Sequence, residues 1–230
     1  MMARMAGFAS GDGTNRQALL DSLRARGSAR AGDVVLVASD HADAGALTRA
    51  RDAGIAAAVI RTRRSPAGGD PLTLLRELRV DFLALAGYLR LVPTGVLADL
   101  PCRVVNVHPA LLPAFGGPGM YGERVHRAVL ASGARVSGAT VHYVEDEYDT
   151  GAILAQWPVP VLADDSAASL AARVLKVEHV LYPRVIDAVA SGRWRFDARP
   201  RPVPDAASRS LMDWDGHRLV EEIDQAFGFT

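Results

Sequence analysis

The sequence predicts an α/β fold with a mostly parallel sheet, helices on both faces and a C-terminal antiparallel hairpin. Short, nearly continuous apolar runs alternate with segments of helical periodicity through the first half of the chain, which is typical of parallel strands covered on both faces. Two further apolar runs, at 139–144 and 153–160, flank a polar loop, as in a hairpin. The length of 230 residues is ample for a core of this kind.

The elements of the parallel part follow from these runs in order. Gly54 stands just after the second expected helix, where a C-cap glycine belongs, and Pro71 begins the third, in the turn that tolerates proline. Helices are expected at 16–26, 44–53 and 71–78. Strands are expected at 5–10, 33–39, 56–60, 81–87 and 104–107.

The hairpin alternates between its two faces. Thr140 and His142 lie on one face, Val141 and Tyr143 on the other, and the loop that joins the two strands contains Asp149. We expect His142 to be a packed residue that supports the site from behind.

The remaining chain predicts one long helix and a tail. A helix over 166–191, interrupted at Pro183, is followed by an extended, proline-rich linker at 198–204. We therefore expect one domain at 1–195 and a C-terminal tail at 196–230 that packs back on it.

Composition excludes several classes of protein. Lys and Arg together number 26, as do Asp and Glu, so no net charge favours nucleic acid or an anionic membrane as a partner. The single cysteine, Cys102, excludes an internal disulfide and a cysteine-based zinc site. No apolar run approaches the roughly 20 residues that a bilayer requires, and the N-terminus is a poor signal peptide. We expect a cytoplasmic protein without a bound metal.

Asn106 and His108 are the strongest candidates for chemistry. They stand two apart at the end of an apolar run, so in a strand their side chains share a face, and Pro109 ends the strand. Imidazole titrates near neutrality and can act as a general acid, while an amide can stabilise an oxyanion. Asp149 would complete the set by holding His108 protonated. These residue types alone leave acyl transfer and a simple binding cleft both open.

Two other segments are candidate binding loops. The segment 10–15, Ser-Gly-Asp-Gly-Thr-Asn, lies between a strand and a helix, where backbone N–H groups can hold a phosphate. It is neither a P-loop nor a dinucleotide fingerprint, and taken alone the segment is better explained as a plain glycine turn with a Thr or Asn cap. Gly87 and Arg90 follow the expected strand at 81–87, at the sheet edge where α/β proteins bind ligands. A surface arginine after a strand-terminal glycine is the alternative there.

Taken together, the motifs resemble the glycinamide ribonucleotide formyltransferase family. The resemblance is collinear from about residue 5 to residue 195, and residues 114–122 form a longer, glycine-rich loop than in many members. It implies a Rossmann-like formyltransferase fold and the transfer of a formyl group from 10-formyltetrahydrofolate to the amine of glycinamide ribonucleotide, a step of one-carbon metabolism in purine biosynthesis. The motifs are Ser10-Gly-Asp-Gly-Thr-Asn15, Leu85-Ala-Gly-Tyr-Leu-Arg90, Asn106-Val-His-Pro-Ala-Leu-Leu-Pro113, Gly138-Ala-Thr-Val-His142 and Asp149-Thr-Gly151.

The resemblance also implies roles for single residues. Asn106, His108 and Asp149 match the catalytic trio, and Asn106 would contact the folate as well. Substrate-binding roles fall on the phosphate loop, on the Gly87 carbonyl for the amine and on a glutamate for the ribose: Gly13, Thr14, Asn15, Gly87 and Glu178. Without the resemblance, Glu178 reads as a solvated helix residue. The folate pocket would be lined by Arg90, Leu91, Glu145 and Asp146.

Several related activities share the Asn-x-His…Asp core. A formyltetrahydrofolate deformylase would carry a regulatory domain before Gly11, and a methionyl-tRNA formyltransferase a tRNA-binding domain after the catalytic one; the sequence favours neither. A sugar-nucleotide formyltransferase and a non-catalytic ligand-binding relative are further alternatives. The partners expected are the two small-molecule substrates, with the protein a monomer or a homodimer.

Overall fold

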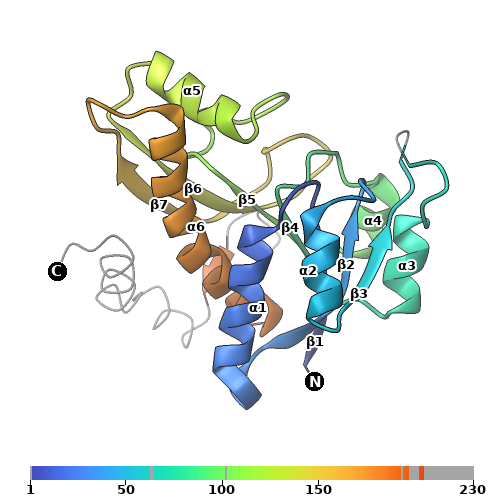
Figure 1. Cartoon of the computed structure of the whole chain (residues 1–230). Coiled ribbons are helices and arrows are strands. Elements are labelled where there is room, and N and C mark those ends of the chain that lie inside the picture. The colour runs from blue at the N-terminus through green and yellow to red at the C-terminus, as the bar shows by residue number, and fades with distance from the viewer. Residues whose placement is uncertain (1, 63–64, 102, 193, 197–201, 205–230) are drawn as a thin grey trace.

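The computed structural model describes residues 2–62, 65–101, 103–192, 194–196 and 202–204. Seven strands form one sheet in the order β3-β2-β1-β4-β5-β6-β7 (Figure 1). The strands are β1 (Ala3–Phe8), β2 (Gly32–Ser39), β3 (Ala56–Val59), β4 (Phe82–Ala86), β5 (Val104–His108), β6 (Val136–Tyr143) and β7 (Ile153–Pro160). The helices are α1 (Thr14–Arg26), α2 (Gly45–Asp52), α3 (Pro71–Glu77), α4 (Thr94–Asp99), α5 (Glu123–Ala131) and α6 (Ala167–Ala190), with a 3-10 turn at Gly27–Ala29.

Strands β1 to β5 are parallel, and β6 and β7 are antiparallel additions at one edge. This arrangement confirms the predicted fold class. The five parallel strands were predicted within a few residues of their observed bounds, because their apolar runs are buried on both faces.

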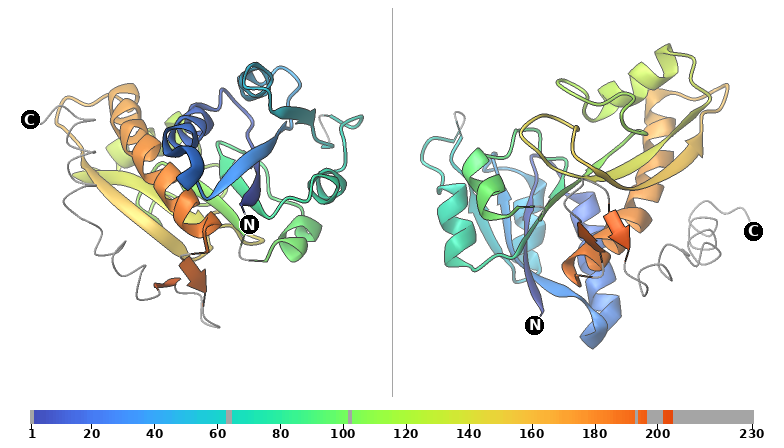
Figure 2. Two further views of the ribbon diagram at one scale, coloured as in Figure 1. Left: turned by 90° about the horizontal axis from the view of Figure 1, so that it is seen from below. Right: turned by 180° about the vertical axis from the view of Figure 1, so that it is seen from behind.

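Helices cover both faces of the sheet, as Figure 1 and Figure 2 show. Alternation along β2 illustrates the division: Val37 packs with α2, whereas Leu36 packs on the other face with the core beneath α3 and α4. Helices α1 and α6 pack against each other and cover β4 to β6 on the α2 side. Helix α5 lies against α6 at the hairpin end of the sheet.

Helix α6 is continuous through Pro183, so the predicted interruption is wrong. The proline removes one backbone hydrogen bond. Its neighbours Leu181, Tyr182, Val185 and Ile186 are all buried in the core, however, and this packing stabilises the helix on both sides of the proline.

Helices α4 and α5 are not among the predicted elements. Helix α4 has six residues, which is too short to show a period of 3.6 residues. Helix α5 follows a glycine-rich loop and buries Val125, His126 and Val129.

The C-terminal boundary of the domain is occupied by a small hairpin. Strand β8 (Trp194–Phe196) pairs with β9 (Pro202–Pro204), so the described part of the expected linker is a paired strand. The expected packing of the tail concerns residues 205–230, which lie outside the described residues, as does Cys102. No helix of the described chain is long and apolar enough to cross a membrane.

Candidate active site

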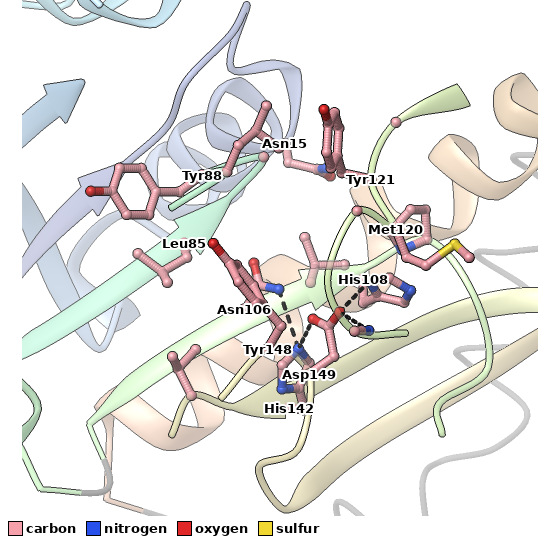
Figure 3. A pocket seen from close by; sticks show the side chains of 18 of the residues that line it. Asn15, Leu85, Tyr88, Asn106, His108, Met120, Tyr121, His142, Tyr148 and Asp149 are labelled. Carbon is pink, nitrogen blue, oxygen red and sulfur yellow. Dashed lines mark hydrogen bonds and ion pairs between the residues drawn. The ribbon is translucent and has the colours of Figure 1, made fainter. Parts of the chain in front are cut away.

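A cleft of about 580 Å³ opens at the carboxyl ends of β4 and β5 (Figure 3). This is the edge at which open α/β sheets bind ligands. Its walls also come from the 117–122 loop, from the loop between β6 and β7 and from α6. The lining includes Asn15, Leu85, Gly87, Tyr88, Arg90, Leu91, Asn106, His108, Met120, Tyr121, His126, His142, Val144, Tyr148, Asp149, Leu175 and Glu178.

The strand register brings Asn106, His108 and His142 together. Asn106 pairs with His142 across β5 and β6, and His108 pairs with Thr140. Because side chains directly opposite in an antiparallel pair share a face, the amide of Asn106 reaches His142, with 3.2 Å between Nδ2 and Nε2. Val105 and Val107 point the other way, into the core beneath α6.

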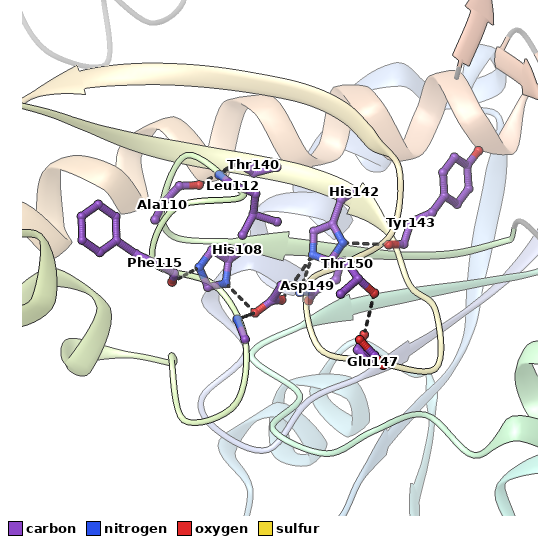
Figure 4. A network of polar contacts seen from close by, with 12 residues as sticks. His108, Ala110, Leu112, Phe115, Thr140, His142, Tyr143, Glu147, Asp149 and Thr150 are labelled. Carbon is purple, nitrogen blue, oxygen red and sulfur yellow. Dashed lines mark hydrogen bonds and ion pairs between the residues drawn. The ribbon is translucent and has the colours of Figure 1, made fainter. Parts of the chain in front are cut away.

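Asp149 lies between the two imidazoles (Figure 4). Its Oδ2 is 3.5 Å from His108 Nδ1, and its Oδ1 is 3.5 Å from His142 Nε2. The residue has a φ of 59°, a left-handed conformation that aspartate tolerates better than most residues. The hairpin loop therefore turns the carboxylate into the cleft.

The 114–122 loop also holds Asp149 in place. The backbone N–H of Gly117 donates to Asp149 Oδ2 over 2.9 Å. A Cβ at Gly116 would lie 2.5 Å from a Leu112 methyl and 3.2 Å from the Asp149 Cβ, so only glycine allows the loop to pass this close.

The tautomer of His142 follows from its contacts. Nδ1 lies 2.7 Å from the Tyr143 carbonyl, which can only accept, so Nδ1 carries a proton. Burial lowers the pKa of His142, although the Tyr143 carbonyl and Asp149 oppose this effect. In the neutral ring Nε2 is then an acceptor, and it takes a hydrogen bond from the Asn106 amide. Asn106 is thereby held with its second amide N–H making no hydrogen bond to the described residues.

His108 is a buried ring with both nitrogens engaged. Nε2 donates to the Phe115 carbonyl over 2.9 Å, and Nδ1 faces Asp149. Burial lowers the pKa of His108, while Asp149 and the Phe115 carbonyl act to raise it. The expected pairing with Asp149 is present, but burial outweighs it, so the ring is less easily protonated than a free imidazole.

The opposite end of the cleft contains Asn15 and Glu178. The Asn15 amide donates to Glu178 Oε2 over 2.5 Å. Burial raises the pKa of Glu178, although the hydrogen bond from Asn15 opposes this. Gly13, at φ 72°, begins α1 without a side-chain cap, which leaves the backbone N–H groups of the first turn for a ligand. Gly13 and Thr14 directly precede Asn15 in the sequence, but they are not among the residues that line the cleft.

The expected folate end is only partly built from the predicted residues. Leu91 lines the cleft as predicted. Gly87, predicted to receive the substrate amine and not the folate, also lines the cleft, and its carbonyl already accepts the Ser10 N–H over 2.9 Å. Arg90 Nε donates to the buried Asp40 over 3.0 Å, which fixes the guanidinium at the rim.

The acidic residues of the β6–β7 loop divide differently from the prediction. Glu145 and Asp146 are exposed and do not line the cleft, whereas Val144, Glu147 and Tyr148 do.

Sequence reasoning missed three kinds of contributor. The Phe115 carbonyl and the Gly117 N–H act through the backbone, so no side-chain pattern reveals them. Tyr121 lines the cleft from a loop without periodicity. His142, expected only as a packed residue, contacts both Asn106 and Asp149; its alternation with Val141 was the signal that placed it on the correct face.

Comparison with known proteins agrees with this geometry. The family model described as formyl transferase matches residues 3–186. A chloroplastic phosphoribosylglycinamide formyltransferase of Arabidopsis thaliana is 46% identical over 204 residues, covering 86% of this chain and 69% of that protein. The one from Vigna unguiculata is 45% identical, with 86% and 64% covered. The chain thus spans about two thirds of the length of these plant relatives.

Solved structures give the same result. Glycinamide ribonucleotide transformylase 1 from Symbiobacterium toebii superposes with a TM-score of 0.78 at 39% identity, covering 88% of this chain and 94% of that one. The family model matches well over half of the 230 residues. The chain belongs to the formyl transferase family.

Proposed function

We propose that this protein transfers the formyl group of 10-formyltetrahydrofolate to the amine of glycinamide ribonucleotide in purine biosynthesis. The observation that carries the proposal is the position of Asn106, His108 and Asp149 in the middle of one cleft. The relatives with 45% and 46% identity bear the name of this activity, and so do several of the solved structures that the fold matches.

The two ends of the cleft suit the two substrates. The uncapped start of α1, with Asn15 and Glu178 beside it, offers donors and acceptors for a ribose phosphate. The other end is walled by Leu85, Leu91, Val144 and Tyr148, and apolar walls of this kind fit a flat pterin ring. The formyl carbon and the amine would then meet beside Asn106.

The chemistry follows from where negative charge develops. The amine nitrogen attacks the formyl carbon, a C–N bond forms and the carbonyl electron pair moves to oxygen. The amide of Asn106 is the donor available to that oxyanion, and the His108 ring, whose two nitrogens face Phe115 and Asp149, contributes a positive charge once it is protonated. The proton that the attacking amine releases passes to His108, and Asp149 stabilises the imidazolium that forms. Collapse of the intermediate breaks the bond to the folate nitrogen, which takes that proton from His108.

This reading gives the low pKa of His108 a role. A buried neutral imidazole takes up a proton most readily when a negative charge appears beside it. Its stabilising effect is therefore greater in the transition state than in the ground state. Holding both substrates in one cleft supplies a large further share of the rate.

The direct test is a spectroscopic assay of folate product from 10-formyltetrahydrofolate, with and without glycinamide ribonucleotide. Release only in the presence of the ribonucleotide supports the proposal. Release without it indicates a hydrolase, and no release under either condition contradicts the proposed transfer.

A variant separates catalysis from binding. His108→Ala should lower turnover by at least about 100-fold while the dissociation constants of both substrates stay within about threefold. An equal loss of affinity and turnover would contradict the role assigned to His108.

A further inference from the structure

Arg16 is a buried cation for which the described residues supply no counter-charge. The residue is 4% exposed, and its Nη1 and Nη2 have no hydrogen-bond partner within the described part of the chain. Burial lowers the pKa of Arg16 to about 10, with Tyr182 opposing this effect, so the side chain is still charged at neutral pH. A buried charge without a partner is costly to the fold.

The guanidinium is held between two glycines. A Cβ at Gly7, in β1, would lie 2.6 Å from Arg16 Nε, and a Cβ at Gly13 would lie 3.0 Å from Nη1. Arg16 therefore passes across β1, and one end of its guanidinium lies directly behind the turn that begins α1. The adjoining cavity, lined by Gly7, Arg16 and Tyr182, measures only about 10 Å³, so no anion fits beside the guanidinium inside the core.

A counter-charge can approach only from the outer side of the Gly13 turn. Helix α1 begins there without a side-chain cap and without an acidic residue in its first turn. Asp12 is turned aside: its Oδ1 would lie 3.1 Å from a Cβ at Gly45, at the start of α2, and its carbonyl accepts from Arg49 Nε over 3.0 Å. The turn thus presents positive potential from the helix terminus and from Arg16 behind it.

We propose that Arg16 is a positioning residue for the ribonucleotide phosphate, the buried counter-charge that complements the phosphate dianion bound at the first turn of α1. It acts through the Gly13 turn and does not touch the substrate. The inference rests on the proposed function, because it assigns the phosphate of that substrate to this turn.

The experiment compares Arg16→Leu with Arg24→Leu, which removes the same charge from the exposed side of the same helix. Dissociation constants are measured for glycinamide ribonucleotide and for its dephosphorylated ribonucleoside, together with KM and kcat. Arg16→Leu should weaken ribonucleotide binding by about tenfold, which corresponds to about 1.4 kcal/mol, and should raise KM to match. Its kcat at saturation and its affinity for the ribonucleoside should stay within about twofold of the wild type.

The unfolding temperature distinguishes a role in phosphate binding from a purely structural role of Arg16. Without ligand, Arg16→Leu should unfold at the same temperature as the wild type or higher, because an apolar side chain replaces an unpaired buried charge. The upward shift of the unfolding temperature by inorganic phosphate should shrink in Arg16→Leu and persist in Arg24→Leu.

Three results would overturn the inference. They are unchanged ribonucleotide affinity in Arg16→Leu, an equal loss of affinity for the ribonucleoside, and failure of both Arg16→Leu and Arg16→Met to fold. Failure of the proposed function looks different, since the wild type itself would then neither prefer the ribonucleotide nor formylate it.

Discussion

Asp149→Asn tests the electrostatic coupling at the centre of the cleft. The substitution preserves the shape of the side chain and its acceptor for the Gly117 N–H, but removes the charge that lies 3.5 Å from His108 Nδ1. An opposite charge at such a distance favours the charged form of a titratable group and so raises a histidine pKa. We therefore expect the pKa of His108 to fall further in the variant.

The effect on rate follows from the resting pKa. Burial already lowers the pKa of His108 below its ordinary value of 6.5, so at pH 7.5 the protonated fraction falls tenfold for each further unit of pKa. If the imidazolium stabilises the oxyanion, kcat should fall by at least about tenfold, the factor that corresponds to one unit of pKa. Activity in the variant should rise as the pH is lowered, because acid restores the proton.

The assay is kcat against pH from 5 to 8 at saturating substrates, paired with an NMR titration of the His108 ring. Asp164→Asn is the matched control, since Asp164 is exposed and does not line the cleft. The reasoning is refuted by a kcat in Asp149→Asn within threefold of the wild type, by an unshifted His108 titration, or by a variant whose kcat does not rise as the pH is lowered.

Three further substitutions test other parts of the structure. Asn106→Ala should lower kcat by about 100- to 1000-fold, because it removes an oxyanion donor; steady-state kinetics with unchanged turnover would contradict that role. Glu178→Gln should raise the unfolding temperature of the ligand-free protein at pH 7 to 8. Burial raises the folded-state pKa of Glu178 above 4.5, so the stability that this group contributes is lost as the pH rises through the folded pKa. The measurement is a pH series of thermal melts, and a variant that is no more stable at pH 8 than the wild type would refute this direction. Gly151→Ala should lower the free energy of unfolding by about 3 kcal/mol, because a Cβ there would overlap the Tyr143 carbonyl; a denaturant midpoint equal to that of the wild type would exclude the overlap.

Periodicity was sufficient for the sheet because its strands are simple apolar runs. The spacing of Asn106 and His108 predicted a shared face, and β5 confirms it. The sequence did not predict which residue of β6 lies opposite Asn106, however. Which residue of β6 faces Asn106 depends on the register, and the sequence between the two strands does not fix the register by itself.

The acid–base behaviour of the site depends on contacts that leave no pattern in the sequence. Asp149 was expected to hold His108 protonated, but the depth of burial decides the net direction of the pKa. The 114–122 loop contributes to the burial of His108, and its Phe115 carbonyl accepts a hydrogen bond from the ring Nε2–H. Arg16 gives a similar lesson: an arginine in the first turn of a helix is ordinarily solvated, and it is buried here because Gly7 leaves room for it.

These two sites share one energetic principle. In the ligand-free protein His108 resists protonation, and the Nη1 and Nη2 of Arg16 have no hydrogen-bond partner among the described residues, so a positive charge at either position becomes more favourable when the substrate brings a negative charge nearby. The free-energy cost of the buried Arg16 charge is carried by the folded protein before the substrate arrives, and we expect it to be recovered at the phosphate, whereas the cost of protonating His108 arises only as the oxyanion forms and is offset there. A fold optimised for stability alone would place apolar side chains at such positions. Substrate binding should therefore stabilise this protein by more than the new contacts alone would supply, because binding also relieves a penalty that the free protein already bears.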